Sequence, residues 1–302
     1  MATGGSTKSV ITALVANLGI AIAKFVGFLV TRSSSMLAES IHSVADTGNQ
    51  ALLLLGGKRA AKEATDTHQF GYGRERYFWS FAVAMLLFSV GAGFAIYEGI
   101  EKIRHPHAIE NVWVAVGILI FAMFLEGFAL TTAYREALPL RADRTWWQFI
   151  RTSRNPELPV VLLEDSGAMI GLVVALSGVG LTELTGNARW DGVATLIIGL
   201  ILAAIAVLLA IEMKSLLIGE SANDDNTAKI DAVLASHPAI DVVTDVKTQH
   251  IGPDDILVAI HAKFDPALAG DELATAIDDV HDQLTAAVPS SRFIYIEPNL
   301  HS

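Results

Sequence analysis

The amino-acid sequence predicts an α-helical membrane protein that ends in a small soluble α+β domain. Of its 302 residues, 52% are hydrophobic, and the mean hydropathy is positive. Six apolar runs are each long enough to cross a hydrocarbon core of about 30 Å as a helix. After residue 215 these runs give way to short amphipathic segments. We therefore expect a six-helix membrane domain over residues 1–215 and a separate domain over residues 216–302.

Each apolar run has about the 20 residues that a spanning helix needs. Aromatic residues such as Trp113 and Trp190 stand at several of the ends, where the headgroup region favours them. No cleavage site of the A-x-A type precedes the first run, so we expect a retained helix and no cleaved signal peptide. The expected spans are Val10–Val30, Ser35–Gly56, Tyr77–Ile100, Val112–Tyr134, Val160–Leu181 and Trp190–Ile211.

The basic residues outside these runs predict the orientation. Most lysines and arginines fall on one side of a six-span arrangement, and only Arg32, Lys102, Arg104 and Arg189 fall on the other. The positive-inside rule then places both termini in the cytoplasm. In a bacterium this would be the inner membrane, with the tail in the cytoplasm. The segment 135–159 is polar, basic and proline-containing, and we expect it to be a cytoplasmic loop.

The C-terminal segment alternates between helix-like and strand-like patterns. Its expected order is αββαβ, which favours a sheet with both helices on one face. Fewer than 90 residues build only a modest core, so packing against a second copy would stabilise this domain. The expected elements are a helix at Asp225–Ser236, strands at Val242–Gln249 and Ile256–Phe264, a helix at Asp271–Ala287 and a strand at Arg292–Glu297.

Composition excludes several classes of chemistry. The chain has no cysteine, so it has neither disulfides nor thiolate ligands, and a bound metal must be held by His, Asp, Glu, backbone or water. A net charge of −11 without a basic stripe argues against nucleic acid as a partner.

Two expected spans carry pairs of ionisable residues that could bind a metal ion. His42 and Asp46 are four residues apart in the second span, so on a helix they share a face and can reach a common metal ion. Alternatively, they bond only to each other or to a neighbouring helix. Glu164 and Asp165 lie in the fifth span and cannot face lipid cheaply, unless that helix starts late and leaves them at its surface. Ionisable groups at membrane depth commonly mark ion pathways.

The chain resembles the cation diffusion facilitator family of metal transporters. The features that carry the resemblance are the six spans, His42 and Asp46 at their spacing, an acid in the fifth span, the segment HQFGYGRERY at 68–77, and the tail with its His237-Pro238 and Glu297-Pro298 pairs. The segments HSVADTGNQALLLLG and LLEDSGA, with Glu126-Gly127, are most similar to the branch containing the animal mitochondrial zinc transporter. The resemblance implies a ferredoxin-like tail and a homodimer.

The resemblance also implies a set of ligands for the transported metal. The family takes two ligands from the second span and a His-x-x-x-Asp pair from the fifth, where Asp165 matches the aspartate but Val161 stands in place of the histidine. His42, Asp46 and Asp165 would then bind, with Glu164, water or Asn17 in fourth place. Such ligands suit Zn²⁺, and an oxygen-rich set also suits Mn²⁺ or Fe²⁺, with Co²⁺ a further candidate.

Other polar residues have both a functional and a structural interpretation. Glu126 in the fourth span could carry protons or support a ligand, or be a neutral acid bonded to a neighbouring helix. Asp66 and His68 fall at the family's accessory loop site, but Tyr72 replaces the second histidine, which favours a solvated loop.

The tail offers a third candidate metal position. His237, His261 and Glu297 match metal positions of the family's tail, although Tyr295 replaces a further histidine. Isolated histidines need converging partners to bind metal, so a tail site depends on whether these residues meet.

These observations predict a secondary transporter that exports Zn²⁺ in exchange for protons through alternating access. Export of manganese or iron is the alternative within the same class. A membrane metalloenzyme is disfavoured because no H-E-x-x-H motif is present, and we do not expect an enzyme. A metal sensor or scaffold without transport is a further alternative, which a flux assay would distinguish.

Overall fold

The computed structural model describes residues 4–109 and 111–299, which form two units. The first contains Met1–Lys58 and Phe78–Met213, and the second contains Arg59–Tyr77 and Lys214–Ser302. The segment 59–77, treated above as a connection inside the membrane domain, thus belongs to the unit of the tail. A functional division at residue 215 stays a prediction.

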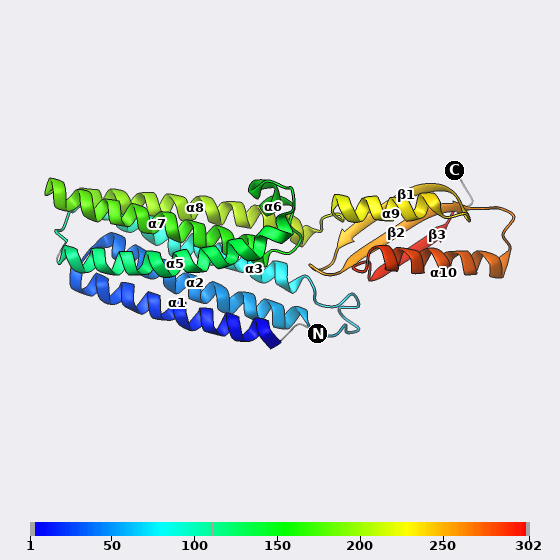
Figure 1. The fold of residues 1–302 in the computed structure, drawn as a ribbon, viewed down its shortest axis with the longest axis horizontal. Coiled ribbons are helices and arrows are strands. Elements are labelled where there is room, and N and C mark those ends of the chain that lie inside the picture. The colour runs from blue at the N-terminus through cyan, green and yellow to red at the C-terminus, as the bar shows by residue number, and fades with distance from the viewer. Residues whose placement is uncertain (1–3, 110, 300–302) are drawn as a thin grey trace. The chain divides into compact units, whose positions relative to one another are not determined.

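The first unit consists of long helices that run side by side (Figure 1). The third expected span is α3 and α4 joined by a single π-helical segment, η1. The first unit also holds a short helix, α6, at Trp146–Thr152. The long elements are α1 Gly4–Thr31, α2 Ser34–Ala60, α3 Glu75–Leu86, η1 Leu87–Ala92, α4 Gly93–Arg104, α5 Val112–Arg141, α7 Glu157–Thr185 and α8 Arg189–Ile218.

Four helical stretches among the described residues are long and apolar enough to cross a membrane: Glu75–Arg104, Val112–Arg141, Glu157–Thr185 and Arg189–Ile218. In α1 the described apolar stretch is shorter, Asn17–Thr31. Helix α2 has 27 residues but a polar buried face that includes Glu39, His42 and Asn49, which lowers its hydropathy. A count of six spans therefore stays a prediction, although the structure shows a mostly helical membrane domain.

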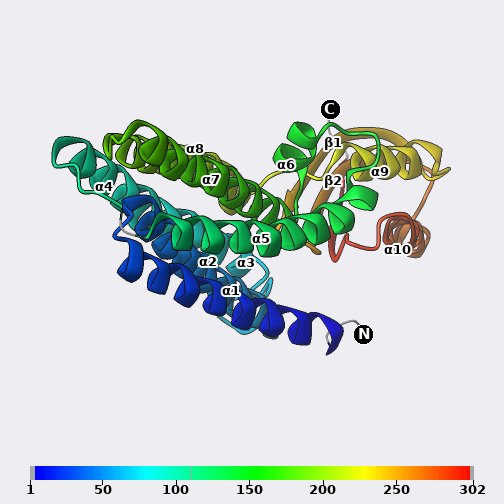
Figure 2. The same ribbon diagram turned by 60° about the vertical axis from the view of Figure 1, so that its left-hand side comes forward.

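Glycines bring α8 against α4. A Cβ added at Gly99 would lie 2.6 Å from the backbone nitrogen of Leu196, and one at Gly199 would lie 2.7 Å from that of Ile96. Small residues that let backbones approach are typical of helix contacts in membranes. Helix α5 lies beside α1 and α7 (Figure 2), and the apolar core includes Leu119, Leu172 and Ile198.

The expected loop 135–159 is partly helical, so this expectation was wrong. Helix α5 continues through Pro139 to Arg141, and α6 follows after Thr145. Pro139 lies close to the end of α5, where a missing N–H removes one intrahelical bond without ending the helix earlier. Thr145 and Gln148 form a capping box that starts α6.

The second unit contains a three-stranded sheet in the order β1-β2-β3. Strand β2 pairs antiparallel with β1 and parallel with β3. The order α9-β1-β2-α10-β3 is the αββαβ order that the sequence predicts. The elements are α9 Asp224–Ser236, β1 Ile240–His250, β2 Ile256–Phe264, α10 Gly270–Ala287 and β3 Phe293–Pro298.

Both helices of this unit cover the same face of the sheet. Alternate residues of β2, among them Val258 and Ile260, are buried in one cluster with Leu234 of α9 and Leu284 of α10. Residues two apart on a strand point to the same face, so this cluster lies between the sheet and both helices. From the segment 59–77, the ring of Phe70 packs edge-on against Phe293, with centroids 5.1 Å apart.

The α4–α8 contact yields a stability prediction. Gly99→Ala should lower the free energy of unfolding by about 1–3 kcal/mol, because the new methyl group meets backbone atoms of α8 that cannot rotate away. Thermal unfolding in detergent measures the loss. Gly117→Ala in α5 is the matched control: its Cβ would meet nothing within 4 Å, and we expect a change within about 0.5 kcal/mol. Equal effects of the two variants would contradict close packing at Gly99.

Candidate metal and proton site

His42 and Asp46 face the interior of the helical bundle from α2. The imidazole Nδ1 lies 3.5 Å from Asp46 Oδ1, and His42 is only 1% exposed. Neither ring nitrogen of His42 nor Oδ1 of Asp46 has a hydrogen-bond partner. Buried polar atoms are nearly always bonded, so these three atoms are available to a ligand such as a metal ion.

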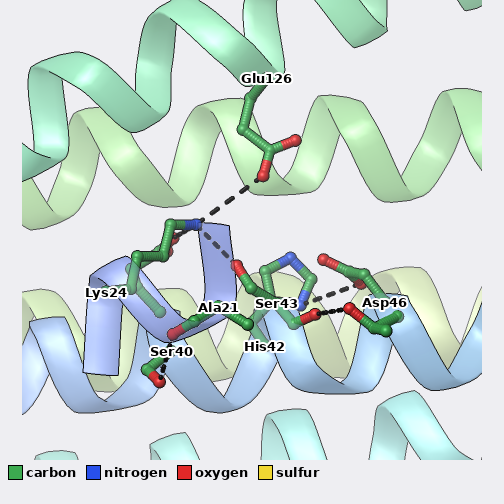
Figure 3. A network of polar contacts seen from close by, with 9 residues as sticks. Ala21, Lys24, Ser40, His42, Ser43, Asp46 and Glu126 are labelled. Atoms are coloured by element: carbon green, nitrogen blue, oxygen red, sulfur yellow. Dashed lines mark hydrogen bonds and ion pairs between the residues drawn. The ribbon is translucent and has the colours of Figure 1, made fainter. Parts of the chain in front are cut away.

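Lys24 of α1 lies beside this pair, and the sequence analysis did not identify it (Figure 3). Its side chain is fully buried, and its Nζ lies 3.1 Å from Glu39 Oε2, donates to Ser43 Oγ at 2.8 Å, and lies 3.8 Å from Glu126 Oε1. One ammonium thus connects α1, α2 and α5. The available signal was a lone lysine inside an apolar run, because such a residue must be paired in a membrane.

Helix α7 contributes the two adjacent acids. Glu164 is buried, and its Oε1 accepts a hydrogen bond of 2.8 Å from Asn49 Nδ2 of α2. Asp165 is half-buried. Asp46 lies within electrostatic reach of Asp165 and Glu126, and Glu164 lies within reach of Asp46. The acids of α2, α5 and α7 therefore share one region.

The structure does not bring these residues into a formed coordination site. Over residues 4–109 and 111–299, no three His, Asp or Glu side chains are placed so that they could hold one metal ion. The ligand set of His42, Asp46, Asp165 and Glu164 therefore stays a prediction. Asn17 is half-buried on α1, and its role as a ligand also stays a prediction.

Val161, one turn before Asp165, has apolar neighbours. It packs against a cluster that contains Ala133 and Ala137 of α5 and Phe149 of α6. A ligand is therefore missing here for two reasons: valine has no donor atom, and its surroundings are hydrocarbon.

A second polar contact fixes the start of α2. Asp191 of α8 is fully buried and accepts hydrogen bonds from Ser33 Oγ at 2.9 Å and from the backbone nitrogen of Ser34 at 2.8 Å. Ser34 Oγ donates to Glu98 of α4 at 2.8 Å. These bonds tie the first turn of α2 to α4 and α8, and so help to position His42, which lies about two turns further along.

The accessory loop residues lie in the second unit. His68 and Asp66 are both exposed, and the ring of His68 stacks on Tyr72, with centroids 4.5 Å apart. This tyrosine stands where the resemblance implies a second histidine. His68 therefore contacts a phenol ring at this position and not a second imidazole. A metal role for His68 and Asp66 stays a prediction.

Of the three tail candidates, the structure brings two together. His261 and Glu297 are partners across β2 and β3, with Nε2 and Oε2 3.3 Å apart. His237 is buried, and its Nε2 pairs with Asp279 of α10 at 3.0 Å while its Nδ1 accepts from the backbone nitrogen of Ala239. Both nitrogens of His237 thus already have partners within the fold.

The charge inside the bundle is unbalanced. Among the residues that the structure describes, five carboxyl groups and one lysine lie in this region: Glu39, Asp46, Glu126, Glu164 and Asp165 against Lys24. Uncompensated carboxylates away from water are costly, so the surplus acids must carry protons or bind a cation. An imidazole among such acids can exchange a proton for a divalent ion.

The family model of the cation efflux transmembrane domain matches residues 10–218, about two thirds of the chain. The chain belongs to the cation efflux family. It is thus a multi-pass integral membrane protein that belongs to a family of transporters and not to a family of enzymes.

Several curated proteins are similar to this chain over most of its length. The mitochondrial proton-coupled zinc antiporter of Xenopus laevis is 35% identical over 86% of this chain and 47% of its own length. Metal tolerance protein C4 of Arabidopsis thaliana is 29% identical over 82% of this chain and 55% of its own length. The cation-efflux pump FieF of Serratia proteamaculans is 25% identical over 81% of this chain and 76% of its own length. The chain spans about half the length of the first of these relatives.

The α2–α7 contact of this cation efflux protein can be tested by stability. Asn49→Ala should cost about 1–3 kcal/mol in unfolding free energy, because it removes the hydrogen bond that Glu164 Oε1 accepts in a buried position. Thr132→Ala is the control, because its exposed hydroxyl bonds only to a carbonyl of its own helix, and its effect should stay within about 0.5 kcal/mol. Chemical unfolding in detergent gives both values, and a fully stable Asn49→Ala protein would show that Glu164 does not need this donor.

Proposed function

We propose that this chain exports a divalent metal ion in exchange for protons, and that the favoured ion is Zn²⁺. The observation that carries the proposal is the group of five carboxyl side chains near His42 and Asp46, four of them buried and Asp165 half-buried, with Lys24 as the one lysine that the described residues place among them. Such a group is neutralised either by protons or by a divalent cation, and alternation between the two is antiport.

In this proposal the metal binds between α2 and α7. His42 and Asp46 supply a nitrogen and an oxygen from one face of α2, and their unpartnered atoms are the ones a metal would take. Asp165 supplies an oxygen from α7. Glu164 is the fourth ligand through Oε2, since its Oε1 is bonded to Asn49.

Proton exchange follows from the same residues. A metal ligand must be deprotonated, so binding releases protons from His42 and the acids, and reprotonation from the opposite side of the membrane releases the metal. Binding should therefore strengthen as pH rises. Glu126 is a candidate proton carrier because it lies within electrostatic reach of Asp46 and belongs to a different helix. Alternating access would come from helices that rock around this region.

Support for zinc comes from similar proteins and from ligand chemistry. The Xenopus laevis relative is named a proton-coupled zinc antiporter. Zinc accepts tetrahedral nitrogen and oxygen ligands. The alternative cargo is Mn²⁺ or Fe²⁺, which the excess of carboxylates over imidazole in the proposed ligand set favours.

The proposal includes an orientation and an assembly. Both termini and the tail would lie in the cytoplasm, so that export moves metal away from the tail side. A homodimer is expected because the second unit leaves Val242, on β1, and Tyr295, on β3, at least half exposed, and a second copy could cover them.

Removal of either ligand from α2 should abolish exchange. In proteoliposomes with a pH gradient, His42→Ala and Asp46→Ala should each lose Zn²⁺-driven proton flux, because each removes a ligand from α2 together with the proton that this ligand exchanges for the metal. A pH-sensitive dye inside the vesicles measures the flux, and Thr132→Ala serves as a folded control. Flux at the wild-type rate in either variant would remove the α2 pair from the proposal.

The two acids of α7 should differ in importance. Asp165→Ala should abolish the same flux, whereas Glu164→Ala should retain part of it, because water can take the fourth position on zinc. Uptake of Zn²⁺ at several pH values distinguishes loss of affinity from loss of turnover. If Glu164→Ala is inactive and Asp165→Ala is active, the roles of the two acids are reversed.

A further inference from the structure

The ammonium of Lys24 makes two hydrogen bonds and a longer ion pair. Glu39 Oε2, Ser43 Oγ and Glu126 Oε1 surround it at 3.1, 2.8 and 3.8 Å, and its exposed fraction is 0%. An ammonium has three N–H groups and no acceptor, so Glu39 and Ser43 take two of these donors, and Glu126 adds a charge at longer range. Side chains of α2 and α5 therefore fix the position of the Lys24 ammonium. The ammonium in turn fixes the carboxylates of Glu39 and Glu126.

Glu39 is enclosed on its other side as well. Its Oε1 lies against α7 at Gly171, where an added Cβ would be only 2.6 Å from it. The carboxylate is therefore wedged between the Lys24 ammonium and the backbone of α7. Its Oε1 has no hydrogen-bond partner, so the ion pair through Oε2 is the polar contact that fixes this carboxylate.

Both acids that Lys24 holds are close to the proposed metal ligands. Glu39 is three residues before His42 on the same helix, and both Glu39 and Glu126 are within electrostatic reach of His42 and Asp46. A divalent cation at His42 would attract any carboxylate this near that lacked a partner. Two further oxygen ligands would change the coordination from tetrahedral toward the oxygen-rich type that Mn²⁺ prefers.

We propose that Lys24 is a specificity-determining residue, whose ammonium keeps Glu39 and Glu126 out of the coordination shell and so favours Zn²⁺ over Mn²⁺. This inference rests on the proposed function, because it takes the metal to bind at His42 and Asp46. Lys24 does not touch the metal and acts by holding the two acids. The single positive charge therefore compensates for a surplus of oxygen donors that the sequence around the site would otherwise offer.

The test is equilibrium binding of Zn²⁺ and Mn²⁺ to the purified full chain in detergent, measured by titration calorimetry. Lys24→Gln should shift the ratio of the two affinities toward Mn²⁺ by roughly tenfold or more, the range that partners of metal ligands usually contribute. The double variant Lys24→Gln with Glu39→Gln should return part of the shift, because one of the two released carboxylates is then absent.

Two single variants complete the test. Lys102→Gln is the matched control, because it removes another buried lysine whose charged neighbours are Asp191 and Glu98, and the ratio should not change. Glu39→Gln should weaken both metals alike and leave their ratio within about threefold, since Glu39 is a partner of Lys24 and not a ligand.

Several results would overturn the inference. An unchanged ratio in Lys24→Gln, or a ratio shifted toward Zn²⁺, would make Lys24 a purely structural residue. If Lys24→Gln does not fold, Glu39→Gln alone decides: a loss of Mn²⁺ binding far greater than the loss of Zn²⁺ binding would make Glu39 a ligand.

The inference and the proposed function can fail separately. His42→Ala should abolish the calorimetric signal, which shows that the measured site is the one in question. A wild-type chain that binds both metals but exchanges none across proteoliposomes would end the transport proposal and leave the selectivity result intact.

Discussion

The constraint on which the bundle depends is that a carboxylate removed from water needs a partner. Lipid offers none, and apolar contact with lipid is no worse than apolar contact between helices, so polar pairs decide which faces of membrane helices meet. Lys24 with Glu39 joins α1 to α2, and Lys24 with Glu126 brings in α5. Asn49 with Glu164 joins α2 to α7. Helix α2 is at the centre of these contacts.

Two kinds of helix contact therefore coexist in the first unit. Helices α4 and α8 meet through glycines at backbone distance, a contact that depends on shape and is indifferent to protons or metal. The middle of α2, in contrast, is held to α5 and α7 by side chains that ions can re-pair. Under the proposed antiport, exchange of metal for protons would alter the second kind of contact and leave the first unchanged. A rocking motion of α2 against α7 is then the movement that the cargo itself can drive.

The sequence predicted the helices and strands much better than the contacts between them. Strand β2 was predicted at its observed bounds, because alternation over Ile256–Phe264 is a local pattern. Lys24 was missed because its meaning depends on Glu126, which lies on a helix distant in sequence. The helix at 146–152 was missed because nearby prolines outweighed a capping box. The assignment of the segment 59–77 to the second unit depends on contacts such as Phe70 with Phe293, which no local pattern encodes.

Val161 and Lys24 both affect which donor atoms are available at the proposed metal site. The resemblance implies a histidine at position 161, and the structure instead places a valine that packs against α5 and α6, so a nitrogen ligand is absent. The remaining acids leave an oxygen-rich region around a single imidazole, which by itself would suit harder ions than zinc. Two of those acids, Glu39 and Glu126, are already engaged by the buried ammonium. Without these two acids, the ligands that remain are about as many as a tetrahedral metal ion binds. Under the two proposals, the valine at position 161 and the lysine at position 24 have opposite effects on selectivity. Transport of zinc would then depend on Lys24, because no histidine stands at position 161.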